Sequence, residues 1–459
     1  MDHIEIIQNY IDIFRNTMHE VESLEVFFHR SLNSFNDYYS NVLNEFRVGL
    51  TICNLFDSVL EKESLEEKNK RIAEILEEKI NEELQLKDIC TIVNFTDNNN
   101  VLRYSMIDKY FSNITYSPTA AKLKLDRAGM YNKILVESVI SHIIVIFENF
   151  IGDVVRILIK KDPLKYLGNQ QIMVSDVIQK GDVAITEKIE QTVDSCLRCS
   201  IDLLSEISKK ETIDIDRHEK ITVPFTEVYY RRNAYIHTDG HANKDYLLKV
   251  DKKYTKNIQI GDELLCDRDY LDDSICILMK IIFSIIFELL RKEKAQAKEL
   301  KYITDYYFIR LLNQNYNLTK YIYKVLSQYN ELEFSDKMNY KINYLNSCKQ
   351  LGETDFVKGE LKKLDVSAMQ DKYKIAKLCL ANATKEIYSS LVNTYPNSFN
   401  ALEIRDWPIF INFRESDEYK QFRNEHLDDF LVGEIIADET VMQPKNESSI
   451  NIEDLIEKT

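Results

Sequence analysis

Apolar residues recur every three or four positions along most of the chain, which is the spacing that predicts one buried face of a helix. The first such stripe contains Tyr10, Ile13, Phe14 and Met18, and similar patterns continue to about residue 118, including a heavily charged helix over 61–86. Only 10 glycines and 6 prolines occur among 459 residues, so few positions break the backbone. We therefore predict an all-α, or mainly α, fold of long helices.

The segment between residues 135 and 155 is apolar on two faces at once. One face carries Leu135, Val139, Ile143, Ile146, Phe150 and Val154, and the other carries Val136, Ile140, Phe147, Ile151 and Val155. A helix of this kind is usually buried between two layers or against a second subunit. His142 and Glu148 interrupt it. We expect His142 to be an ordinary core or edge histidine, whereas Glu148 needs a cationic partner, such as an arginine from the polar helix near residue 230.

Breaks in the pattern predict four regions. The proline of Ser117-Pro118 disfavours helix in the residue before it, and so separates a helical N-terminal region (1–118) from a central helical bundle (119–295). Paired helices follow in residues 296–436; they resemble a short α-solenoid of tetratricopeptide type, without a fixed repeat. Residues 437–459 are acidic and polar, and are predicted to be disordered. Within the bundle, residues 243–266 predict short extended segments with a small β-hairpin around Gly261.

The net charge of −16 repels nucleic acid from most of the surface, so any RNA contact has to be a local basic site. The most apolar run, Ile275 to Leu290, has 16 residues and carries Lys280, Ser284 and Glu288 on one stripe. A membrane-spanning helix needs about 20 apolar residues, so this run is predicted to be a core helix. The first residues show no basic segment followed by an apolar one, and we predict a cytoplasmic protein.

A polar stretch, Arg231 to Gly240, lies between these apolar helices and carries the candidate chemistry. Its Asp239-Gly240 end predicts a helix stop, because glycine adopts the left-handed conformation at low cost. His237 then falls in the last turn, where the helix dipole favours a protonated imidazole. Arg232 lies five positions earlier, about 140° around the helix, whereas Asn233 shares a face with His237. Arginine provides a planar charged group for phosphate, and histidine can transfer protons near neutral pH.

The order Arg232-Asn233-x-x-x-His237, preceded by Arg231, resembles the signature of HEPN domains, which are α-helical domains of many prokaryotic RNases, toxins and anti-phage systems. The resemblance covers roughly residues 130–292 and includes a long first helix with an internal acidic residue, here Glu148. It implies a metal-independent endoribonuclease that needs no cofactor and leaves a 2′,3′-cyclic phosphate. It also implies a homodimer in which the motif helices of both subunits share one cleft, and a role in anti-phage defence or toxin-like growth arrest.

The resemblance also implies residue roles. His237 would accept the 2′-hydroxyl proton or protonate the leaving oxygen, and Arg232 would stabilise the charge of the phosphorane. Asn233 would position the histidine or the phosphate, Arg231 would be a second RNA contact, and Glu148 would orient Arg232. DNA should be inert, because it lacks the nucleophile. A sensor or inhibitor protein is a further expected partner, and the C-terminal helices would provide its docking surface.

Two alternatives remain open at this point. His237 and His241 are four apart and, with Asp239 and Asp245, have a spacing compatible with zinc, but Gly240 should break the helix between them. The bundle could instead be a catalytically inactive scaffold or interaction module. The single Cys196-x-x-Cys199 motif has no second pair, and we interpret it as two packed thiols and not as a metal or redox site.

Overall fold

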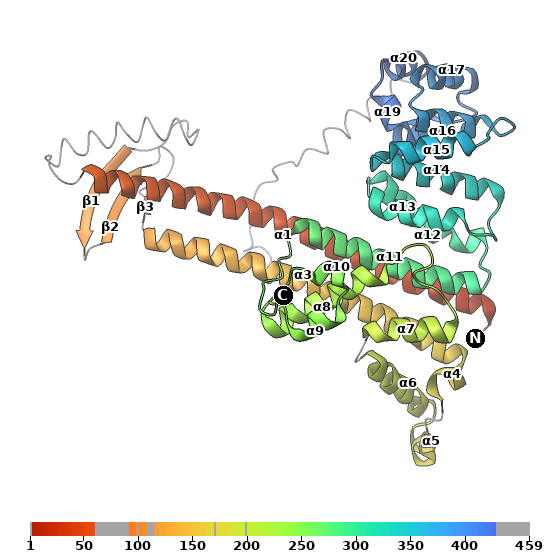
Figure 1. Cartoon of the computed structure of the whole chain (residues 1–459), viewed down its shortest axis with the longest axis horizontal. Coiled ribbons are helices and arrows are strands. Elements are labelled where there is room, and N and C mark those ends of the chain that lie inside the picture. The colour runs from red at the N-terminus through yellow and green to blue at the C-terminus, as the bar shows by residue number, and fades with distance from the viewer. Residues whose placement is uncertain are drawn as a thin grey trace, which may run out of the picture. The chain divides into compact units, whose positions relative to one another are not determined.

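The computed structural model describes residues 2–59, 91–98, 101–107, 114–116, 118–168, 171–197 and 200–427, and their secondary structure is mainly helical, as predicted (Figure 1). The N-terminal and bundle elements are α1 (His3–Val59), β1 (Thr91–Asn98), β2 (Val101–Ile107), β3 (Ile114–Tyr116), α3 (Pro118–Lys161), α4 (Pro163–Leu167), α5 (Val174–Lys180), α6 (Asp182–Leu197), α7 (Ser200–Glu211), α8 (Thr222–Thr238), α9 (Lys244–Lys249), α10 (Lys252–Thr255) and α11 (Arg268–Lys292). The C-terminal elements are α12 (Ala297–Leu312), α13 (Tyr316–Ser327), α14 (Phe334–Gln350), α15 (Thr354–Lys363), α16 (Asp371–Ala381), α17 (Thr384–Thr394), α18 (Ala401–Asp406), η1 (Pro408–Phe410), α19 (Ile411–Arg414) and α20 (Asp417–His426).

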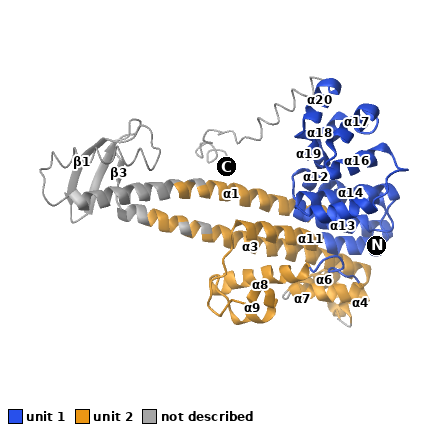
Figure 2. Cartoon of the chain, turned by 45° about the horizontal axis from the view of Figure 1, so that its top comes forward, with its two compact units in different colours: residues 1–12, 213–220, 283–459 blue, residues 13–212, 221–282 orange. Residues whose placement is uncertain are grey.

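The chain forms two compact units, which are coloured separately in Figure 2. Unit 1 comprises residues 1–12, 213–220 and 283–459, and unit 2 comprises residues 13–212 and 221–282. Two helices contribute to both units, because the division falls within α1 and within α11. The four regions expected from the sequence are continuous segments, whereas the two units combine separate segments. The two units therefore do not test the predicted boundaries. The predicted charged helix over 61–86 and the predicted disordered tail both lie outside the described residues.

We had predicted that the N-terminal region is helical throughout, and this prediction is wrong. Strands β1, β2 and β3 form an antiparallel sheet in that order, and β1 pairs with β2 from Thr91–Ile107 to Asn98–Val101. The segments are rich in isoleucine, valine, threonine and aromatic residues, which favour strands. Residues 99 and 100, between β1 and β2, lie outside the described residues. A turn between two short β-prone segments indicates a hairpin, and helical spacing alone did not reveal it.

Helix α3 is the main core helix of unit 2. It begins at Pro118, as the sequence predicted, and ends at Lys161, where the Asp162 side chain accepts a hydrogen bond from the Lys165 backbone and starts α4. Both of its apolar faces are largely buried, and they pack against α6 and α8. Phe147 contacts Phe225 of α8 edge to face, with ring centroids 4.6 Å apart. The two-sided pattern therefore predicted the position of this helix between other helices.

The stretch before α11 differs from the predicted β-hairpin. Residues 244–255 form α9 and α10, which begin where the side chains of Asn243 and Asp251 accept hydrogen bonds from backbone N–H groups. These asparagine and aspartate caps favour helix over strand. Backbone pairing is limited to one antiparallel bridge between His241 and Glu263, with neighbouring hydrogen bonds such as Gly261 N to Ala242 O. Gly261 is thus part of a closing turn with φ +91°, and not the tip of a hairpin.

Helix α11 buries its polar stripe as well as its apolar faces. In unit 1, Glu288 is 3% exposed and accepts hydrogen bonds from Arg217 and Arg291, while the Ser284 hydroxyl lies 2.7 Å from that of Tyr321. The helices that follow contact their neighbours in sequence order, from α12 with α13 to α16 with α17. Their aromatic cluster near Trp407 includes the buried Phe399, Phe410, Phe413 and Phe422.

Among the described residues, one helix is long and apolar enough to cross a membrane, namely the part of α3 from Leu123 to Lys161. Half of its most apolar window is buried inside the protein, and a single helix of this kind is weak evidence for a membrane span. The run Ile275–Leu290, which we had taken as the most apolar, does not meet this test.

Candidate functional site

Helix α8 carries the candidate motif and ends as the sequence predicted. It begins at Thr222, and Pro224 lies in its first turn, where the missing N–H costs no hydrogen bond. His237 is in the last turn. Asp239 adopts the left-handed conformation with φ 55°, Gly240 follows with φ 79°, and the Gly240 N–H donates to the Ala234 carbonyl at 3.2 Å. The glycine stop therefore fixes the backbone directly after His237.

The imidazole of His237 is exposed to solvent. Among the residues that the structure describes, it has no hydrogen-bond or ion-pair partner. Ile236 beside it is 47% exposed, and Asn233, one turn earlier, is half-buried. The candidate acid–base group is therefore open to a ligand and is not packed inside its own subunit.

Arg232 points from α8 to α3 and pairs with Glu148. Its Nη2 donates to Glu148 Oε1 at 3.1 Å, and the Ser200 hydroxyl donates to the same oxygen at 3.1 Å. Side-chain exposure is 17% for Arg232 and 30% for Glu148. The guanidinium carbon lies 5.3 Å from the Tyr229 ring centre. The structure thus confirms that Glu148 pairs with an arginine of the motif helix.

One nitrogen of this guanidinium remains unused. Arg232 Nε is buried and has no hydrogen-bond partner within the described part of the chain. A buried donor without a partner costs about 1–3 kcal/mol. Arg232 is therefore held in place by Glu148 while one of its donors is left unsatisfied.

Arg231, the adjacent residue, lies in a closed network. Its Nε donates to Glu227 at 2.7 Å and its Nη1 to the Leu265 carbonyl at 2.5 Å, while its guanidinium lies 4.3 Å from the Tyr270 ring centre. Tyr246 and Tyr270 both donate to Glu227, at 2.6 and 2.8 Å. Burial raises the pKa of both tyrosine hydroxyls, so they remain protonated donors at neutral pH. Because its guanidinium is occupied by these partners, Arg231 is poorly placed to contact RNA phosphate.

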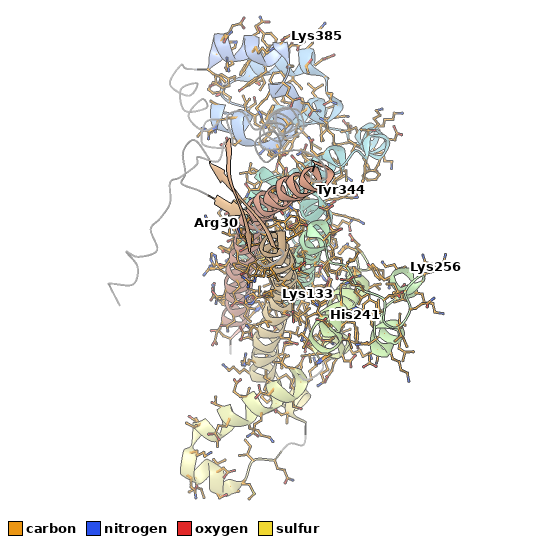
Figure 3. All side chains as sticks on the ribbon, turned by 90° about the vertical axis from the view of Figure 1, so that its left-hand side faces the viewer. Arg30, Lys133, His241, Lys256, Tyr344 and Lys385 are labelled. Atoms are coloured by element: carbon orange, nitrogen blue, oxygen red, sulfur yellow. The ribbon has the colours of Figure 1, made fainter. Side chains whose placement is uncertain are left out.

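The residues of the alternative zinc site do not come together, and two of them have other partners. Asp239 forms an ion pair with Lys133 of α3 at 2.5 Å, which lowers the pKa of its carboxyl group. His241 Nδ1 lies 3.1 Å from the Thr238 carbonyl oxygen, and Asp245 is exposed in the first turn of α9. Figure 3 labels Lys133 and His241, which lie on neighbouring segments of unit 2. In the described ranges, no three His, Cys, Asp or Glu side chains come together in a way that could hold a metal ion.

The structure also describes two other residues from the sequence analysis, His142 and Cys196. His142 is exposed and lines a groove of about 740 Å³ between α1 and α3, so it is an edge histidine and not a core one. Cys196 is a half-buried free thiol whose pKa is raised by burial, and Cys199 lies outside the described residues.

Sequence reasoning missed several residues of this site, namely Lys133, Ser200, Glu227, Tyr246 and Tyr270. Only Glu227 left a clear signal, because a glutamate four positions before an arginine on a helix predicts an ion pair.

Comparisons of the chain with models of protein families, with curated proteins and with solved structures found no match.

Proposed function

We propose that this protein is a metal-independent endoribonuclease of the HEPN kind. The observation that carries the proposal is the end of α8, where an exposed histidine follows an arginine that is fixed by Glu148 and keeps one donor unsatisfied. RNA transesterification requires a group that transfers protons, here His237, and a fixed cation, here Arg232.

In the proposed reaction, the 2′-hydroxyl oxygen of the substrate attacks the adjacent phosphorus. One His237 accepts the hydroxyl proton, a second protonates the leaving 5′-oxygen as its bond to phosphorus breaks, and the products are a 2′,3′-cyclic phosphate and a 5′-hydroxyl. Arg232 stabilises the charge that develops on the phosphorane, and Glu148 holds Arg232 in position. Asn233 orients the imidazole or the phosphate. Arg231 stabilises the local fold in this scheme and is not a phosphate ligand.

The second His237 would come from a homodimer. A two-fold interface brings two copies of one small cationic motif together, which creates a positive cleft on a chain of net charge −16. Exposed apolar side chains are available for such an interface on α3 and α8: Met130, Tyr131, Ile134 and Ile236. The Lys133–Asp239 ion pair connects the two helices at this place.

The proposed setting is the cytoplasm of a prokaryotic cell, in anti-phage defence or growth arrest, with a sensor or inhibitor protein as a further partner. It rests on the sequence resemblance, and the partly buried α3 is compatible with a soluble protein.

The test uses His237→Ala with His142→Ala as the matched control, because His142 is an exposed histidine of unit 2 outside the motif. Wild type and the control should cleave a single-stranded RNA in the presence of EDTA and leave a 2′,3′-cyclic end. His237→Ala should lose at least about 100-fold in rate, since acid–base catalysis contributes roughly 10²–10⁴-fold. Light scattering of the same samples should give a dimer. Undiminished cleavage by His237→Ala would remove this assignment.

An inactive scaffold is the second candidate, and the burial of Arg232 against Glu148 favours it, because an ion pair of this kind also stabilises a fold. Expression in bacteria separates the two functions. If the protein is a nuclease, the wild type should arrest bacterial growth and His237→Ala should not. If it is a scaffold, the wild type and His237→Ala should have the same effect on growth.

A further inference from the structure

Unit 1 contains a cavity that the proposed nuclease function does not use. It has a volume of about 490 Å³ and is lined by residues of α12, α13, α14, α16 and α18 and by the segment that precedes α18. Figure 3 labels Tyr344 on α14, one turn after the lining residue Tyr340. All of these elements belong to the same compact unit.

The wall of the cavity is aromatic. Tyr323 and Tyr340 are stacked, with ring centroids 5.9 Å apart and an angle of 25° between the rings. Phe399 and Trp407 are 5.6 Å apart. Apolar surface also reaches solvent here, since Leu402 is 48% exposed. The cavity therefore offers ring faces and an apolar path toward solvent.

A polar group without a partner lies in this wall. Tyr323 is 1% exposed, and its hydroxyl makes no hydrogen bond of ordinary geometry within the described residues. The Asn343 side chain lies near enough to influence the hydroxyl, but its Oδ1 already accepts from Trp407 Nε1 at 3.0 Å. Burial raises the pKa of Tyr323, so the group remains a neutral hydroxyl. This hydroxyl has almost no surface exposed to the cavity, so it belongs to the packed wall and not to the surface that a ligand would contact.

Carboxylates outnumber cations around the cavity. Its lining includes Asp305, Glu403 and Asp406 but only one basic residue, Lys372. Asp305 and Asp406 also pair with Lys301 and Arg405, which do not line the cavity. Their carboxylates are 60% and 46% exposed, and surface pairs of this kind are worth only about 0–1 kcal/mol. They therefore remain available to a ligand.

From this arrangement we infer that the cavity binds an organic cation, a guanidinium or alkylammonium group on an apolar stem. Aromatic faces attract such cations, and the carboxylates complement their charge. The stem packs along Leu312 and Leu402, and the cationic head lies against the aromatic wall beside the exposed Asp305 and Asp406 carboxylates. The group is either an arginine or lysine side chain of a protein partner or a free small amine. The inference does not depend on the nuclease function.

The chain provides its own probe for this site. Trp407 is the only tryptophan of the protein and lines the cavity, so fluorescence excited selectively at tryptophan reports on this wall. The full-length protein is titrated with agmatine, with the peptide acetyl-Leu-Ala-Arg-Ala-Leu-amide, and with the same peptide carrying citrulline, which has the shape of arginine without its charge. We expect a saturable change with the arginine peptide and at least tenfold weaker binding of the citrulline peptide. Agmatine that binds as tightly as the arginine peptide would identify a small amine as the ligand, and tighter binding of the peptide would identify a protein segment.

Three variants complete the test. Asp305→Asn combined with Asp406→Asn should weaken binding of the arginine peptide at least tenfold, whereas Asp355→Asn, a 99% exposed aspartate of the same unit, should not change it. Tyr323→Phe removes a hydroxyl that a ligand does not reach, and should leave binding of the arginine peptide unchanged. The inference is overturned if the citrulline peptide binds as tightly as the arginine peptide. It is also overturned if no probe gives a saturable change in fluorescence up to about 10 mM, which corresponds to about 3 kcal/mol of binding free energy. It is also overturned if Asp305→Asn combined with Asp406→Asn leaves the affinity for the arginine peptide unchanged.

Discussion

The polar side chains in the middle of α8 and those at its end differ in how fully they are hydrogen-bonded. Around Arg231, every charge has a counter-charge or a hydrogen bond, because Glu227, Tyr246 and Tyr270 close the network. Around His237, six residues further along, the imidazole is exposed. Arg232, five residues before His237 and about 140° around the helix, keeps an unsatisfied nitrogen. Two adjacent arginines of one motif thus have different roles. Arg231 is enclosed by its partners, whereas the exposed end of the helix is the part that the proposed function uses.

The strongest test of this difference is Glu227→Ala. It leaves the buried Arg231 guanidinium without its counter-ion, and removing one member of a buried ion pair costs about 3–5 kcal/mol. Urea denaturation should show this loss in the free energy of unfolding. Glu263→Ala, at an exposed position, is the control and should stay within about 0.5 kcal/mol of wild type. A cost of less than about 1 kcal/mol for Glu227→Ala would mean that the network is not structural.

A matched pair of substitutions at the two arginines compares the regions directly. Arg232→Met should reduce RNA cleavage about 10²–10³-fold, because one transition-state contact is lost, while the free energy of unfolding falls by only about 1 kcal/mol. Arg231→Met should destabilise the protein by about 3 kcal/mol, because it leaves the buried Glu227 carboxylate without its cation. Rates and urea midpoints measured on the same preparations give both values. The reverse pattern would show that the two roles are exchanged.

The smallest expected effect concerns alkaline pH. Burial raises the pKa of Tyr246 in the folded protein above the usual value of about 10. Above pH 10 the unfolded chain therefore loses this proton while the folded protein retains it, so stability falls by about 1.4 kcal/mol per pH unit for this one group. Tyr246→Phe should be less stable than wild type at pH 7 and should decline less steeply between pH 10 and 12.

Urea denaturation at several pH values measures that slope. Tyr131→Phe, at an exposed position, is the control and should decline as wild type does. Equal slopes for Tyr246→Phe and wild type would contradict the burial of this hydroxyl.

The sequence predicted the open end of α8 better than the network. The stop at Gly240 and the position of His237 follow from local backbone preferences, and the Glu148–Arg232 pair follows from the cost of an unpaired carboxylate on an apolar helix. The network joins Glu227 to tyrosines 19 and 43 residues away, and helical spacing contains no information about such distant contacts.

Two errors of the sequence analysis have local causes. The strands β1 to β3 were read as helix because stripes of apolar residues were extended across a segment rich in β-branched residues. The helices α9 and α10 were read as strands because their capping residues, Asn243 and Asp251, were not recognised. In the first case the local propensity was present in the sequence, but the helical periodicity had been given more weight.

The left-handed stop after α8 has a consequence for mutational tolerance. A side chain at Gly240 would meet the Tyr235 ring at 3.3 Å and would have to adopt a φ of +79°, so this position admits little variation. His237, three residues earlier, has a side chain that no described neighbour holds. A substitution of His237 should therefore leave the course of the backbone unchanged, so an inactive form of the proposed enzyme would be expected to keep the glycine after losing the histidine.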